Sequence, residues 1–279
     1  MLARLAAAKP PQRVLDFPYY DGAHIRAARG SGRLSPMQWS DQGVVLGVRK
    51  HGETGVILEL MTQEHGRHLG LVHGGRSKRL QAVLQPGNSV LAVWRARLDE
   101  HLGTYQIEAQ DFRAARFMGS PLALYGLATM AALLRFLPER DPHPALYHAT
   151  AVLVDHLDDD DIAPALFVHF ELALLAELGF GLDLSECAAT GVRDNLRYVS
   201  PKSGRAVSAA AGEPYKDRLL SLPGFLIGQT SANRPAPQDL EAGFALTDYF
   251  LRSHVFEPRG QKAPEERARF VALATRRDA

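Results

Sequence analysis

The hydrophobic pattern of this chain changes its period once, near Ser120, and this change constrains the fold more than any other feature. Residues 37–118 carry short alternating or β-branched runs separated by Gly, Pro, Asn or Asp, with no amphipathic segment long enough for a βαβ crossover. From Ser120 onward, apolar residues recur at helical spacing. The sequence therefore predicts a multidomain α+β protein, with a first domain of strands and a second of helices.

Five strands are predicted in the first domain, with a short helix after the third. The strands read QGVVLGVRKHG, TGVILELMTQEHG, RHLGLVHGG, NSVLAVWRARL and GTYQIEAQDF, and the helix reads SKRLQAVLQ. This is the plan of an OB-fold, a small partly open β-barrel, although periodicity alone does not exclude another small barrel. We expect Trp39, Trp94, Tyr105 and Phe112 to fill the barrel rather than stack bases, but strand alternation leaves the facing of Trp94 undecided.

The second domain, residues 119–279, is predicted to be mainly α-helical. Ser120 and Pro121 suit an N-cap and a first helical turn, and Gly179 or Gly181 suits the C-terminal cap of the third helix. A turn-rich, irregular insert covers about residues 183–215. The predicted helices cover residues 120–139, 143–159, 162–181, about 236–255 and about 264–276.

The N-terminal segment and the single cysteine bear on where the protein works. Residues 1–36 hold six Lys and Arg against two Asp and Glu, with Pro and Gly, and predict a disordered basic extension. Met37 is a candidate start of the folded protein or of translation, and a basic tail that helps to bind nucleic acid is the alternative to inert disorder. Cys187 is the one cysteine, so no disulfide forms within the chain, which fits a reducing compartment. No apolar run approaches the roughly 18–20 residues of a membrane span. We expect a cytoplasmic protein that does not bind membranes.

The segment HGGRSKR, residues 73–79, sets two glycines beside three cations at the end of a predicted strand. It lacks the second glycine of a phosphate-binding P-loop. One interpretation is an ordinary solvated turn. On an OB-like barrel, we favour the interpretation that its cations bind nucleic-acid phosphates. The candidate DNA-binding residues are the cations of this turn and of the neighbouring strands: Arg49, Lys50, Arg67, Arg76, Lys78, Arg79, Arg95 and Arg97.

Catalytic and metal-binding patterns are weak, so we expect no enzyme and no cofactor. The run Asp158–Asp161 lacks the glycine of a calcium loop, and is expected to be a solvated loop in which Asp161 caps the next helix. His65, His68 and His73 straddle a turn without the ligand pattern of a metal site. Cys187 has no evident catalytic partner in the sequence. No nucleophile, zinc-protease or dinucleotide motif is present.

From Met37 to its end, the chain resembles the RecO family of bacterial DNA repair and recombination mediators. The resembling stretches are VVLGVRKHGETGVILELMTQEHGR, GLVHGGRSKR, LQPGN, FELALLAELGFGLDLSECAATG, YVSPKSGRAVS and LLSLPGFL, in the family's order and spacing. The resemblance implies an N-terminal OB-fold and a helical C-terminal domain. It also implies binding and annealing of single- and double-stranded DNA, association with RecR, and contact with the acidic C-terminal tail of single-stranded DNA-binding protein, which helps RecA to load.

One departure from the family concerns zinc. Some members carry two Cys-x-x-Cys pairs in the insert, and here the four positions are Cys187, Thr190, Ser200 and Ser203. Hydroxyls do not replace thiolates as zinc ligands, so we expect the insert to hold no zinc. Arg135 and His169 are the candidate residues for docking the acidic tail. The competing functions are an OB-fold RNA-binding module and, further behind, a metal-dependent nuclease or phosphatase.

Overall fold

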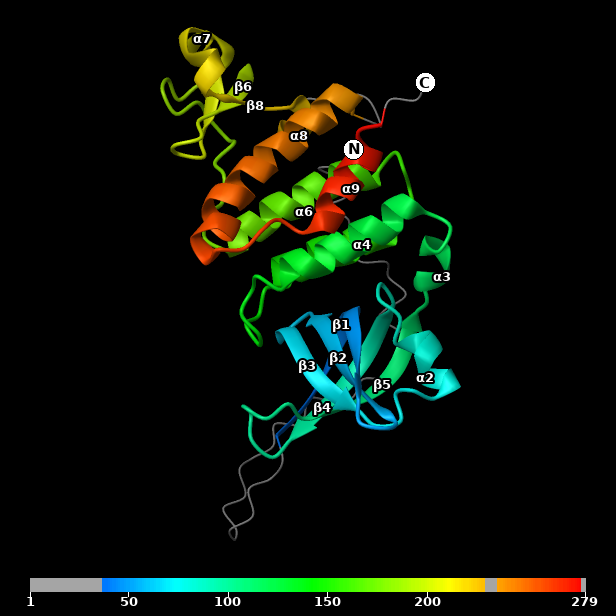
Figure 1. Ribbon diagram of the computed structural model, residues 1–279. Coiled ribbons are helices and arrows are strands. Elements are labelled where there is room, and N and C mark those ends of the chain that lie inside the picture. Colours follow the sequence, from blue (N-terminus) through cyan, green and yellow to red (C-terminus); the bar gives the residue numbers. More distant parts are fainter. Residues whose placement is uncertain (1–36, 229–234, 277–279) are drawn as a thin grey trace, which may run out of the picture.

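The computed structural model describes residues 37–228 and 235–276. It consists of a small β-barrel and a layer of helices packed on one side of it, with the insert projecting from the helices away from the barrel (Figure 1). The predictions for residues 1–36 fall outside the described residues. The two-domain α+β architecture is confirmed.

The first domain is a closed five-stranded barrel in the order β1-β2-β3-β5-β4. The long strand β1 pairs with β4 through its first half and with β2 through its second half, which closes the barrel. The bounds are Met37–His51 for β1, Gly55–Thr62 for β2, Gly66–Val72 for β3, Ser89–Ala96 for β4 and Thr104–Asp111 for β5. The predicted short helix is present as α2, Lys78–Val83, between β3 and β4. This strand order and helix position confirm the predicted OB-like fold.

Aromatic rings fill one end of the barrel interior. Trp94 is fully buried and donates its indole N–H to the carbonyl of Leu102 at 3.0 Å. Tyr105 is also buried, and Trp39 is half-buried between Trp94 and His65. The interior placement predicted from the sequence is thus confirmed for Trp94 and Tyr105. It is wrong for Phe112, which lies just beyond β5 and is 57% exposed.

The buried pair of His68 and Tyr105 makes the stability of the barrel depend on pH. The Tyr105 hydroxyl lies 2.8 Å from His68 Nδ1, and burial lowers the pKa of His68 from 6.5 to about 3. Between these values the unfolded chain binds a proton that the folded chain does not, so stability falls as the pH drops below 6.5. We expect a loss of about 2 kcal/mol from this residue between pH 7 and pH 5.

Urea unfolding of the wild type and of His68→Gln at both pH values measures this contribution. The loss between pH 7 and pH 5 should shrink in His68→Gln and persist in His73→Gln, which changes an exposed histidine beyond the same strand. An unchanged pH dependence in His68→Gln would refute the assignment.

The helical domain is built around α6, whose sequence is apolar on nearly every face and is accordingly buried on nearly every face. Ser120 caps α4, as predicted, by accepting a hydrogen bond from the backbone N–H of Ala123. Gly179, at φ +87°, ends α6, with the N–H groups of Gly179 and Phe180 bonded to Ala176 and Leu175. The α-helices are α3 Ala114–Phe117, α4 Pro121–Leu134, α5 Pro144–Asp155, α6 Ala163–Glu177, α8 Pro237–Phe250 and α9 Glu265–Ala274. After α8 the chain continues as the π-helical segment η4, Leu251–Phe256, and the single turn η5, Glu257–Arg259.

The insert forms a small three-stranded sheet in the order β7-β6-β8. Its strands are β6 Leu196–Val199, β7 Ala206–Ser208 and β8 Leu220–Ser221, and the short helical segments α7 Ala209–Gly212, η2 Glu213–Arg218 and η3 Gly224–Ile227 complete it. The two turns at the positions of the family's cysteine pairs are closed by backbone hydrogen bonds, from Gly191 N–H to Cys187 and from Gly204 N–H to Ser200. The buried Cys187 Sγ accepts a hydrogen bond from the Ser208 N–H at 3.3 Å. One thiol and three hydroxyls do not fit zinc, and these backbone bonds hold the turns instead.

The two domains share a core. A network of ion pairs and hydrogen bonds beside it, made by Glu59, Arg67, Arg135 and Arg140, also joins them, and we call it the clasp. Val44, Leu46 and Met61 of the barrel belong to the hydrophobic cluster of the helical domain. Beside them, Glu59 on β2 forms ion pairs with Arg67 on β3 and with Arg135 at the end of α4. Arg140, from the loop that follows α4, donates to the carbonyls of Asp99 and His101 in the β4–β5 loop. The helical domain therefore holds the β4–β5 loop of the barrel in place.

Candidate nucleic-acid interface

Two loops that are separate in the sequence meet at one end of the barrel, and five cations lie on these loops or on the elements that border them. The Arg76 backbone N–H donates to the Thr54 carbonyl at 3.1 Å, and its guanidinium donates to the Glu53 carbonyl at 2.5 Å. The β1–β2 hairpin thus lies against the turn between β3 and α2. These segments carry five cations, which we call the loop cluster: Arg49 and Lys50 near the end of β1, Arg76 in the turn, and Lys78 and Arg79 at the start of α2.

The two glycines of the 73–79 segment make this contact possible. Gly74 has φ +63°, a conformation that L side chains rarely adopt. At Gly75, a Cβ atom would lie 2.5 Å from Val56 Cγ2, so a side chain there would push the turn away from β2. Ser77 then caps α2 through its hydroxyl. The glycines therefore serve a tight turn that holds Arg76, Lys78 and Arg79 beside the hairpin.

The loop cluster has charge that other side chains do not neutralise. All five residues are exposed, and within residues 37–228 and 235–276 none of them forms an ion pair with a carboxylate. The side chains of Arg49, Lys50, Lys78 and Arg79 also form no hydrogen bond with the described residues. Exposed, unpaired cations of this kind can bind the phosphates of a nucleic-acid backbone.

Arg95 and Arg97 extend this surface along the same end of the barrel. In the strand register, Arg49 on β1 pairs with Ile57 on β2, and Ile57 pairs with Leu71 on β3. Leu71 pairs with Thr104 on β5, which lies opposite Arg95 on β4. Arg95 and Arg97 are exposed, and Arg95 donates to Gln38 Oε1 at 2.7 Å. The half-buried Ile57 and Leu71 lie between the two groups of cations.

Arg67 lies apart from this surface. It is the second residue of β3, near the helical domain, and only 14% of its side chain is exposed. Its guanidinium donates to Glu59 at 3.0 Å and to the Leu137 carbonyl at 3.4 Å. This charge is already engaged in the clasp between the domains, so we exclude Arg67 from the proposed phosphate-binding set.

Comparison with known proteins agrees with this architecture. Residues 37–111 match the family model described as Recombination protein O N terminal, and residues 118–263 match Recombination protein O C terminal. The chain belongs to the RecO family. It is 66% identical over 243 residues to a protein of Methylorubrum extorquens named DNA repair protein RecO, covering 86% of this chain and 99% of that protein. A protein of the same name from Mesorhizobium japonicum is 60% identical over 236 residues, covering 85% and 93%.

A second basic surface of this RecO protein lies on the helical domain. An open pocket of about 540 Å³ is lined by Arg135 and Phe136 beyond α4, by Arg259, Gln261 and Lys262 beyond η4, and by Ala132, Pro264 and Glu266. The Arg259 guanidinium lies 5.9 Å from the centre of the Phe136 ring. The sequence singled out Arg135 but missed Arg259 and Lys262, because no periodic pattern links residues more than 120 positions apart.

His169, the other candidate for docking, lies elsewhere. It is on α6, its ring packs edge-on against Phe225 at 5.9 Å, and burial lowers its pKa. Its Nε2 is buried and has no hydrogen-bond partner among the described residues. His169 therefore packs within the helical domain and does not line the pocket of Arg135.

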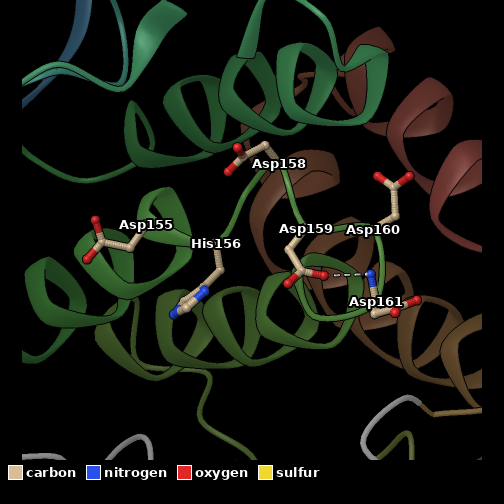
Figure 2. Close-up of a pocket in the computed structure, with 6 residues that line it drawn as sticks. All are labelled: Asp155, His156, Asp158, Asp159, Asp160 and Asp161. Atoms are coloured by element: carbon tan, nitrogen blue, oxygen red, sulfur yellow. Dashed lines mark hydrogen bonds between the residues drawn. The ribbon is translucent and has the colours of Figure 1, made fainter. Parts of the chain in front are cut away.

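The acidic run lies in the loop between α5 and α6, with its carboxylates spread around an open depression (Figure 2). Asp159 Oδ1 accepts hydrogen bonds from the backbone N–H groups of Asp161 and Ile162. The N-cap of α6 is Ile162, so the expectation that Asp161 caps this helix is wrong. In the described residues, no group of three or more His, Cys, Asp or Glu is placed to hold a metal ion.

The three clustered histidines have separate environments. His65 Nδ1 lies 2.9 Å from Asp41 Oδ2 and its ring stacks on Trp39, while His68 is buried against Tyr105 and His73 is exposed. They do not converge on one point.

Within the described ranges, no helix is both long enough and apolar enough to cross a membrane.

Proposed function

We propose that this RecO protein binds single- and double-stranded DNA through the barrel and anneals complementary strands. The observation that carries the proposal is the loop cluster, five exposed cations on or beside two loops that meet at one end of an OB-like barrel. Arg95 and Arg97 continue the contact. Binding of phosphates by cations releases counterions, so affinity should fall steeply with salt. The mechanism is electrostatic screening of two strands, and it makes or breaks no covalent bond.

The helical domain supplies docking surfaces for proteins. The pocket of Arg135, Arg259 and Lys262 sets three cations against one carboxylate, Glu266, beside the apolar Phe136, and this net positive charge suits an acidic peptide with an apolar end. We assign it to the acidic C-terminal tail of single-stranded DNA-binding protein. Together with RecR, the protein would then help RecA to load onto coated strands in the cytoplasm, at the nucleoid. This proposal rests on membership of the RecO family and on the charge of the pocket.

The test is fluorescence annealing of complementary oligonucleotides coated with the cognate single-stranded DNA-binding protein. We expect Arg76→Ala/Lys78→Ala/Arg79→Ala to fold normally by circular dichroism and to anneal at least about tenfold more slowly. The slope of the logarithm of single-strand affinity against the logarithm of salt concentration should fall by about 2, because three phosphate contacts are lost.

The matched control is Arg197→Ala/Lys202→Ala/Arg218→Ala, which removes three exposed cations from the insert, far from the barrel (Figure 1). It carries the same change in net charge and should anneal like the wild type. If both triple variants anneal equally slowly, the rate depends on the net charge of the protein and not on the position of the cations. Tighter binding of RNA than of DNA by the wild type would favour the RNA-binding alternative.

A further inference from the structure

Arg135 belongs at the same time to the acidic-peptide pocket and to the clasp between the domains. It lines the pocket beside Phe136, and its guanidinium also binds the carboxylate of Glu59 on β2. Two of its nitrogens take part: Nε donates to Glu59 Oε2 at 3.0 Å and Nη2 donates to the same oxygen at 2.8 Å, while Nε also lies 3.3 Å from Oε1. The arginine of the pocket thus already holds a carboxylate, which comes from the barrel.

We propose that Glu59 is a built-in competitor for the acidic peptide at Arg135 and sets the affinity of the pocket. The inference rests on the proposed docking of an acidic tail. A carboxylate of the tail would replace Glu59 at the guanidinium, so that one ion pair is exchanged for another. The energy of the internal pair is therefore subtracted from the energy of docking.

The surroundings of the pair allow this exchange. The Arg135 side chain is 49% exposed, whereas that of Glu59 is 13% exposed, so the arginine can turn toward solvent while Glu59 stays in place. A Cβ atom on Gly47 would lie 3.1 Å from Arg135 Nη2, so the glycine leaves room for the guanidinium to approach the barrel. Lys262 and Arg259 line the same pocket and would hold further carboxylates of the peptide.

Arg67 keeps Glu59 paired during the exchange. Its Nη1 donates to Glu59 Oε1 at 3.0 Å, and its Nη2 is anchored on the Leu137 carbonyl. When Arg135 leaves, Glu59 keeps this second arginine and is not left as an unpaired buried charge, which would be strongly unfavourable. Without Arg67, Glu59 would depend on Arg135 alone and would hold it more firmly.

This arrangement gives two variants effects of opposite sign on peptide affinity. Glu59→Gln removes the competing charge, so the peptide should bind about 3–10-fold more tightly. Arg67→Gln leaves Glu59 with Arg135 as its remaining arginine, so the peptide should bind about 3-fold more weakly. A general loosening of the clasp would move both affinities in the same direction.

The measurement is fluorescence anisotropy of a labelled synthetic peptide carrying the acidic C-terminal sequence of the cognate single-stranded DNA-binding protein, with the full-length chain. Glu108→Gln, an exposed carboxylate of β5, makes the same charge change away from the clasp and should leave the affinity unchanged. Circular dichroism and thermal unfolding check that each variant folds.

The outcomes separate this inference from the assignment of the pocket. If the peptide binds and Arg135→Ala abolishes binding, but Glu59→Gln and Arg67→Gln match the wild type, the pocket stands and the competitor is refuted. If the peptide binds equally well to Arg135→Ala, or binds none of the variants, the assignment of the pocket fails and the inference fails with it. Opposite shifts in the two variants support both.

Discussion

Replacing Arg267 by methionine is expected to lower the free energy of unfolding by about 3–5 kcal/mol. Arg267 on α9 reaches into the helical core and binds Glu171 of α6 through two bonds, Nε to Oε1 at 2.6 Å and Nη2 to Oε2 at 2.9 Å. The Glu171 side chain is fully buried. Without the guanidinium, the Glu171 carboxyl group would remain buried inside the domain with the Thr247 hydroxyl as its remaining side-chain partner among the described residues.

The electrostatics of the pair explain why its charges persist in the core. Burial on its own would lower the pKa of Arg267, but the charge and hydrogen bonds of Glu171 outweigh burial and the pKa is raised. Asp248 adds a second carboxylate, 2.8 Å from Nη1. The network joins α6, α8 and α9, so its loss should loosen the packing of all three helices.

Urea unfolding of wild type and variants tests this expectation. Arg269→Met is the matched control, because it makes the same substitution two residues further along α9 at an exposed position. We expect it to cost less than about 1 kcal/mol. The double variant Glu171→Leu/Arg267→Met removes both charges and should recover much of the stability lost in Arg267→Met. A loss below about 1 kcal/mol in Arg267→Met would contradict the importance of the buried pair.

The secondary structure could be predicted from the sequence because period and turn chemistry are local properties. Strands β2 to β5 follow the alternation of their apolar residues, and β1 contains the predicted β-branched run but begins earlier, at Met37. Ser120 and Gly179 act at the helix ends as predicted. The prediction for Asp161 was wrong because the backbone N–H of Ala163, which an N-cap at Asp161 would bind, donates to the Asp159 carbonyl, and Pro164 has no N–H. Phe112 lies one residue beyond β5, where alternation no longer determines the side of the sheet.

The polar networks could not be predicted, because they join residues that are distant in the sequence. Glu171 and Arg267 are separated by 96 positions, and Glu59 and Arg135 by 76. The sequence placed Arg67 among the barrel cations but could not show that its guanidinium reaches Glu59, which lies diagonally across from it on β2. The loop cluster was anticipated as a set of cations. Its geometry depends on the contact between Arg76 and the β1–β2 hairpin, which only the folded barrel provides.

Replacing Gly66 by alanine should cost about 3–4 kcal/mol of stability, for two reasons that add. Gly66 starts β3 at φ +64°, where an L side chain is strained. Its new Cβ atom would also lie 1.8 Å from the carbonyl oxygen of Asp141, in the loop that follows α4. The obstacle is backbone and not a flexible side chain, so the helical domain would have to move away from the barrel.

Gly52→Ala isolates the first of these two costs. Gly52 lies in the β1–β2 hairpin at φ +59°, and a Cβ atom there would meet nothing within 4 Å. Its substitution should cost only about 1 kcal/mol, which is the backbone strain alone. Urea unfolding of both variants measures the difference, which reports how closely the two domains approach. Equal losses at the two glycines would mean that the contact between Gly66 and Asp141 does not hold the domains together.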